Sequence, residues 1–136
     1  MYIIFLVFLL FNTSCKKDNN TLTGNWKLIS YEDFINDTII YEPQNISSSI
    51  IIEFSDNGRK GKLKGQTVTN TVSGKYKLKE NNKIEVLEFG GTKIGEPEWG
   101  KKFWDAMYNV TSYGVTEYNL YLLFNNDTEK MIFEKQ

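Results

Sequence analysis

The sequence contains no histidine, only one cysteine and no marked excess of charge of either sign. Without histidine, histidine-based triads and metal sites are excluded, and one cysteine cannot form a CxxC redox pair or an internal disulfide. The 16 basic and 17 acidic groups give a net charge of −1, which argues against a nucleic-acid-binding surface of the usual basic kind. We therefore expect no nucleic-acid partner, and we assign no cofactor, no metal site and no catalytic residue.

The apolar run that opens the chain is too short to cross a membrane. Residues 1–11 are uncharged, and as a helix they would rise only about 16 Å against a hydrocarbon core of about 30 Å. Such a run is typical of a signal peptide. Thr13 and Ser14 directly before Cys15 resemble the lipobox of bacterial lipoproteins, in which the cysteine sulfur is acylated and the cysteine becomes the mature N-terminus. We predict a lipoprotein signal peptide over residues 1–14 and lipid attachment at Cys15; the alternative is a plain secreted protein or a misassigned start.

The polar residues after the cysteine predict where the protein resides. The short polar stretch resembles that of lipoproteins from the Bacteroidota, and Lys16 in place of an aspartate favours the outer membrane by resemblance to the enterobacterial sorting rule. Residues 15–21 would then be the acylated cysteine and a tether that reaches roughly 20 Å when extended. Membrane contact through the lipid anchor is therefore expected, on either the periplasmic or the surface face.

The remaining chain, residues 22–136, is long enough for one domain with a single core. Alternating apolar and polar residues predict β-strands, and Asp56-Asn57-Gly58 is typical of a tight hairpin turn. The expected strands cover residues 24–31, 38–41, 48–55, 60–71, 73–79 and 84–89, with a terminal hairpin over 120–124 and 131–133.

One segment has helical rather than strand periodicity. Pro97 suits the first turn of a helix, and Glu98 and Lys102 would pair on its outer side. The apolar stripe of this helix consists of Trp99, Phe103, Trp104, Met107 and Val110. We predict an α+β fold, mainly antiparallel β: a curled, barrel-like sheet of about seven or eight strands with one helix near the C-terminal third.

Several segments of this domain match a known pattern in order and distance. They are residues 22–28, the N-x-x-x-G-x-Y spacing of Asn70, Gly74 and Tyr76, residues 91–98 before the aromatic helix, and residues 120–122 with 131–133. Together they resemble the META domain of the HslJ-like family of small bacterial envelope proteins. The resemblance implies a barrel-like META-type sheet and a role in envelope stress or antibiotic tolerance, without established catalytic residues. Thr69 and Glu96 stand where many members have cysteine, so a cysteine-linked role does not carry over.

The candidate site residues each have a structural and a functional interpretation. Glu96, Glu98 and Asp105 could supply a carboxylate pair for hydrolysis, but acidic residues also favour a helix N-terminus. Gly24-x-Trp26 resembles the first strand of lipocalins. The aromatic residues that could line either a ligand pocket or the core are Trp26, Trp99, Phe103 and Trp104.

Two surface features are also candidates for contact or modification. Arg59, Lys60, Lys62 and Lys64 form a basic arm that could meet lipid phosphates, and Asp37-Thr38-Ile39 fits a short O-glycosylation pattern. The leading hypothesis is a membrane-anchored, non-catalytic envelope lipoprotein that binds an unknown envelope protein, with no oligomeric state assigned. The alternative is a lipocalin-like carrier of a small apolar ligand.

Overall fold

The computed structural model describes residues 21–136, so the expected signal peptide and Cys15 lie outside the described residues. The fold is α+β and predominantly antiparallel β, as the sequence predicts, with nine strands and one helix in the described part. The elements are β1 (Gly24–Asp33), β2 (Thr38–Tyr41), β3 (Ile51–Asp56), β4 (Lys60–Gln66), β5 (Thr71–Lys79), β6 (Lys83–Gly91), α1 (Glu98–Met107), β7 (Val110–Val115), β8 (Asn119–Phe124) and β9 (Glu129–Lys135).

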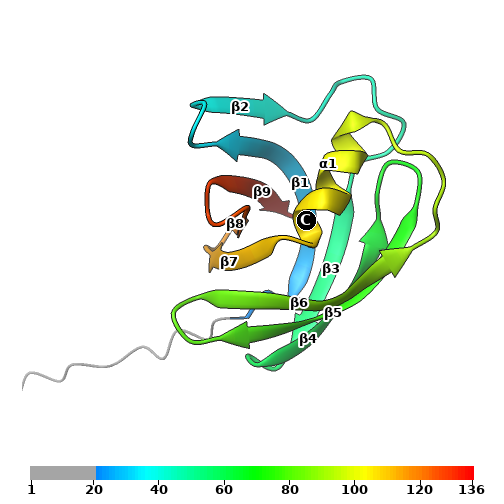
Figure 1. The fold of residues 1–136 in the computed structure, drawn as a ribbon. Coiled ribbons are helices and arrows are strands. Elements are labelled where there is room, and N and C mark those ends of the chain that lie inside the picture. Colours follow the sequence, from blue (N-terminus) through cyan, green and yellow to red (C-terminus); the bar gives the residue numbers. More distant parts are fainter. Residues whose placement is uncertain (1–20) are drawn as a thin grey trace, which may run out of the picture.

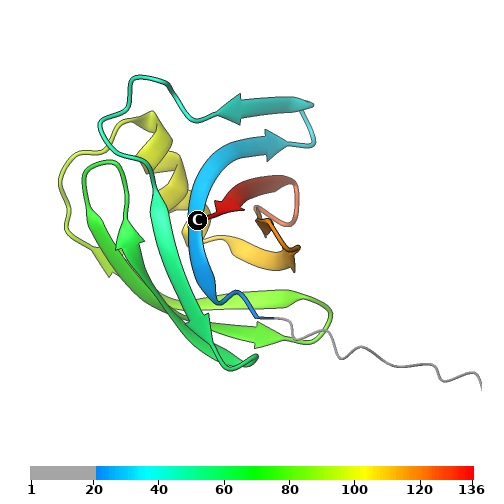
Figure 2. The same cartoon turned by 180° about the vertical axis from the view of Figure 1, so that it is seen from behind.

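The sheet curls into a ring that β1 closes (Figure 1 and Figure 2). From β3 to β9 each strand pairs with the next along the chain, and β9 pairs antiparallel with β1. On its other edge, β1 pairs with β3 through its first residues and with β2 through its last residues. The short strand β2 therefore extends the ring at one end, and all four of its residues are exposed.

The interior of the ring is filled with apolar side chains. Inward and outward residues alternate along β1, β5 and β8, which is the pattern expected of strands with one buried face. The indole Nε1 of Trp26 donates a hydrogen bond to the carbonyl oxygen of Leu22 at 2.8 Å, so this buried polar atom has a partner. The largest fully buried side chains include Trp26, Phe54, Tyr76, Phe103 and Phe133.

Helix α1 covers the place where the ring is least paired. Strands β6 and β7 share one register pair, Lys83 with Ser112, so the far half of β6 turns away from β7. There Phe89 of β6 packs edge-on against Phe103 of α1, with ring centroids 5.9 Å apart. The predicted stripe is correct as far as Met107, but Val110 is the first residue of β7, a strand that the sequence did not predict.

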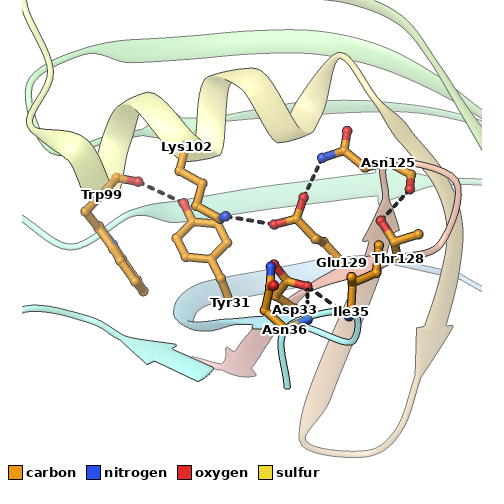
Figure 3. A network of polar contacts seen from close by, with 9 residues as sticks. All are labelled: Tyr31, Asp33, Ile35, Asn36, Trp99, Lys102, Asn125, Thr128 and Glu129. Atoms are coloured by element: carbon orange, nitrogen blue, oxygen red, sulfur yellow. Dashed lines mark hydrogen bonds and ion pairs between the residues drawn. The ribbon is translucent and has the colours of Figure 1, made fainter. Parts of the chain in front are cut away.

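A second set of contacts joins α1 to the turn between β8 and β9 (Figure 3). Lys102 Nζ lies 2.8 Å from Glu129 Oε1 and 5.3 Å from the ring centroid of Tyr31. The predicted Glu98–Lys102 pair is therefore wrong, because Glu98 pairs instead with Lys101. The Tyr31 hydroxyl donates to the carbonyl oxygen of Trp99 at 2.8 Å, and burial, followed by the charge of Glu96, raises the pKa of Tyr31.

Candidate functional site

A surface hollow of about 470 Å³ lies between α1 and the loop that precedes it. This hollow brings together residues from three parts of the chain that are distant in sequence. The first is the turn between β4 and β5, the second is the loop after β6, and the third is α1 with its C-terminal cap. The lining residues are Asn70, Thr92, Lys93, Ile94, Gly95, Glu96, Lys101, Trp104, Asp105 and Tyr108.

Asn70 holds the loop after β6 in position. Its Nδ2 donates to the carbonyl oxygen of Ile94 and to Glu96 Oε1, both at 2.8 Å. Its Oδ1 accepts from the backbone N–H of Ile94 at 2.7 Å and from the Thr92 hydroxyl at 2.9 Å. Because Asn70 is buried, these contacts satisfy an amide that would otherwise be costly to desolvate.

The carboxylate of Glu96 is the second centre of the same network. Its Oε1 accepts hydrogen bonds from the Thr67 hydroxyl, the Asn70 amide and Trp104 Nε1. Its Oε2 is buried without a hydrogen-bond partner among the described residues, and it faces Gly100 on α1. A Cβ at Gly100 would overlap Oε2, so the absence of a side chain at Gly100 lets the helix lie over the carboxylate.

Aromatic rings form one wall of the hollow. Trp104 and Tyr108 pack edge-on against Phe89, with centroid distances of 5.0 Å and 5.6 Å. The Tyr108 hydroxyl donates to the carbonyl oxygen of Phe89 at 3.2 Å, which fixes the ring although 61% of the residue is exposed. Ile94 on the opposite side is also exposed. The hollow thus offers apolar contact area beside polar groups, as ligand sites commonly do.

The four aromatic candidates from the sequence separate into two groups. Trp26, Trp99 and Phe103 are buried in the core, and only Trp104 lines the hollow. Trp99 Nε1 is buried without a hydrogen-bond partner in residues 21–136. Cys15, the expected lipid attachment site, belongs to the part of the chain that is not described.

The structure brings together two of the three candidate carboxylates. Glu96 and Asp105 both line the hollow, whereas Glu98 is outside it, with a side chain that is 93% exposed and 3.5 Å from Lys101 Nζ. Within residues 21–136, no group of three or more histidine, cysteine, aspartate or glutamate side chains is arranged to hold a metal ion. The arrangement supports contact with a ligand and does not by itself identify a reaction.

Sequence reasoning missed the joint action of Thr67, Asn70 and Glu96. The sequence singles out Asn70 through its spacing to Gly74 and Tyr76, and Glu96 as an acid near the helix and as a position where many META members have cysteine. A usable signal was the Thr67-x-x-Asn70 turn, in which the Asn70 N–H donates to the Thr67 hydroxyl oxygen at 3.1 Å. Its contact with a loop 26 residues away depends on the pairing of β5 with β6.

Comparisons with known proteins give a family and a fold. The sequence profile of DUF4847, a domain of unknown function, matches residues 10–135. An NMR structure of a protein from Burkholderia xenovorans has a TM-score of 0.66 and 19% identity, covering 83% of this chain and 81% of that chain. A crystal structure of a DUF4847 family protein from Bacteroides vulgatus has a TM-score of 0.61 and 16% identity, covering 84% and 94%. No curated protein matches, and no described helix is long and apolar enough to cross a membrane.

Proposed function

This chain belongs to the DUF4847 family, a domain of unknown function, and we propose that it is a membrane-anchored envelope lipoprotein whose domain binds and does not catalyse. The observation that carries the anchor is the Thr13-Ser14-Cys15 sequence after an uncharged apolar run. The resemblance to the META domain adds a role in envelope maintenance or stress tolerance. The outer membrane is the expected location.

The start of the folded domain supports a short tether. Leu22 is completely buried, and its backbone N–H donates to Asp56 Oδ2 at 2.9 Å, so the compact body begins seven residues after Cys15. Six intervening residues reach about 20 Å at most. An acylated Cys15 would therefore keep the domain beside the bilayer, and the fatty chains would bind strongly enough to prevent its diffusion away.

The geometry of Glu96 supports binding over catalysis. Its Oε1 is occupied by three donors from the protein, and its Oε2 faces α1. A carboxylate held in this way positions the loop and has little freedom to act as acid, base or nucleophile. Trp26 and Phe103, which a lipocalin-like carrier would need around its ligand, are packed in the core, which favours a surface site over an internal one.

Metabolic labelling tests the anchor. Cells that express the full chain and receive a clickable fatty acid should incorporate label into the wild-type protein and into an Asn19→Ala control. The Cys15→Ala variant should remain unlabelled and should be missing from the outer-membrane fraction. Equal labelling of Cys15→Ala and wild type would overturn the proposed attachment site.

Site-specific photo-crosslinking tests the binding role of the hollow. Tyr108 lines the hollow and is 61% exposed, whereas Tyr118 lies outside it and is 66% exposed, so the two positions form a matched pair. A benzophenone amino acid at position 108 should give a discrete adduct in intact cells, and the same group at position 118 should not. Identical adduct patterns at both positions would contradict a binding role for this hollow.

A further inference from the structure

The outer surfaces of β4 and β5 carry an unusual concentration of cations for a chain with a net charge of −1. Along both strands, exposed basic residues alternate with inward residues such as Leu63, Tyr76 and Leu78, so the basic side chains share one face. We call this surface the lysine face. It consists of Lys60, Lys62, Lys64, Lys75, Lys77 and Lys79, and Arg59 lies in the turn just before β4.

The strand register sets like charges directly opposite each other. Lys60 pairs with Lys77, and Lys62 pairs with Lys75. Directly opposed like charges destabilise a sheet, so contacts among these lysines do not stabilise the fold. At the margins, Lys64, Lys75 and Lys79 form ion pairs with Glu53, Glu88 and Glu85.

The centre of the lysine face lacks this compensation. Among residues 21–136, neither Lys60 nor Lys62 has a carboxylate within ion-pair distance. Both line a broad surface hollow of about 1370 Å³ over β3 to β6, whose other polar side chains include Ser55, Ser73 and three carboxylates. Two of these carboxylates, Glu53 and Glu88, pair with Lys64 and Lys75, and the third, Asp56, accepts from Tyr76 and from the Leu22 N–H. Ammonium groups and hydroxyls around a wide hollow are donors suited to phosphate oxygens.

The described chain begins beside this face. Asp56, the last residue of β3, accepts at Oδ2 from the Leu22 N–H and from the Tyr76 hydroxyl, and its own N–H donates to Thr23 Oγ1 at 3.1 Å. Arg59 follows three residues later. Figures 1 and 2 show the start of β1 next to the end of β3 and the start of β4, so the described chain begins at the same end of the sheet as Lys60, the first residue of β4.

We propose that the lysine face docks onto the anionic phosphate headgroups of the bilayer in which Cys15 is anchored. The inference rests on the proposed function, because the tether supplies a high local concentration of the face at the membrane. Basic residues near an anionic membrane surface are attracted to it, and the attraction decays within a Debye length of about 8 Å at physiological salt. A tether that reaches about 20 Å at most brings the lysine face close enough to the bilayer for its cations to come within that range.

Lysine acetylation read by mass spectrometry tests this orientation. The acylated protein, purified from cells, is reconstituted into phosphatidylcholine vesicles with or without phosphatidylglycerol. Lys60 and Lys62 should react at least about threefold more slowly on the anionic vesicles, and 0.5 M salt (about a 4 Å screening length) should remove the difference. Lys93 and Lys101, which line the hollow beside α1, serve as internal controls and should react equally on both vesicles.

Paired charge reversals complete the test. The Lys60→Glu and Lys62→Glu double variant should show no protection on anionic vesicles at the remaining lysines of the face. A Lys130→Glu and Lys135→Glu double variant on β9, whose residues line neither hollow, should show the same protection as wild type. Equal acetylation rates on the two vesicles would overturn the proposal. So would protection that appears only with soluble polyphosphate, which would identify a free polyanion as the occupant.

The two proposals fail in distinguishable ways. A protein without fatty chains would not float with phosphatidylcholine vesicles, and that result would reject the anchor. A protein that floats with both vesicles and yet shows equal lysine reactivity keeps its anchor and rejects only the docking of the lysine face.

Discussion

The hollow beside α1 and the lysine face differ in whether their central polar groups have partners within the protein. In the hollow, Asn70 and Glu96 direct their polar atoms mainly to partners within the protein. On the lysine face, Lys60 and Lys62 stand opposite other lysines and have no internal counter-ion in the described chain. The difference indicates that the hydrogen bonds of Asn70 and Glu96 stabilise the fold. The positions of Lys60 and Lys62 are not explained by fold stability, so we look for their role in a contact with another molecule.

The largest stability loss in this comparison should follow from Asn70→Ala. The substitution leaves the Ile94 backbone groups and Glu96 without their buried partner, which should lower the free energy of unfolding by about 3 kcal/mol. Urea unfolding followed by tryptophan fluorescence measures the change. Asn109→Ala, which removes one exposed hydrogen bond to the Asp105 carbonyl oxygen, is the control and should cost less than about 1 kcal/mol. Similar losses in the free energy of unfolding for both variants would show that the buried hydrogen bonds of Asn70 contribute no more than one exposed hydrogen bond.

Gly100→Ala should have the next largest effect. Helix propensity alone favours alanine by about 1 kcal/mol, but the new Cβ would overlap Glu96 Oε2, so we expect a net loss of about 1 to 2 kcal/mol. Gly95→Ala has open space around its Cβ and should be close to neutral. In a Glu96→Ala background, Gly100→Ala should become stabilising, and a persistent loss there would contradict the packing explanation.

Asp127 is a more exposed counterpart of Glu96: it also accepts from three side chains, but it lies in a turn and its side chain is 37% exposed. The hydrogen bond from Thr111 is the largest cause of its lowered pKa, with smaller effects from Ser112 and Lys83. A lowered carboxyl pKa stabilises the fold above its ordinary value near 4, and this contribution is lost as the pH falls through the folded-state pKa.

The wild-type protein should therefore be more stable than Asp127→Asn by less than about 1 kcal/mol at pH 7, because the carboxylate is partly exposed and solvent screens its interactions. The difference should shrink on acidification below about pH 4. Denaturant unfolding of both proteins between pH 7 and pH 2.5 measures it. A difference that grows toward low pH would contradict the assigned hydrogen bonds.

The smallest effect should have the opposite sign. Lys62→Glu replaces a like-charge pair with an attractive pair opposite Lys75, so stability should rise by a few tenths of a kcal/mol. Thermal unfolding at low and high salt should show a gain that salt reduces. A clear loss of stability would mean that Lys62 has a structural role and would weaken the contrast between the two regions.

Local patterns in the sequence predicted much of the fold. The hairpin of β3 and β4 follows from alternating residues around Asp56-Asn57-Gly58, and the start of α1 follows from Pro97. The end of α1 was misjudged because Val110 continues the helical spacing by coincidence while beginning β7. No local pattern shows whether Val110 continues the helix or begins a strand, because its strand conformation depends on the pairing of β7 with β8.

The candidate site was less predictable for a related reason. Glu96 and Trp104 were both recognised, but Asn70 joins them through contacts whose geometry depends on strand register across the ring. The pairing of Lys102 with Glu129 also depends on how α1 lies over the β8–β9 turn. The resemblance to the META domain stays a prediction beside the established DUF4847 membership.

Intact mass spectrometry of the protein extracted from its native membrane tests the central claim most directly. A lipid-anchored protein should have a mass that corresponds to a chain beginning at Cys15, increased by diacylglycerol and any amide-linked fatty acid. A chain that still starts at Met1, or a Cys15 thiol without lipid, would contradict the account.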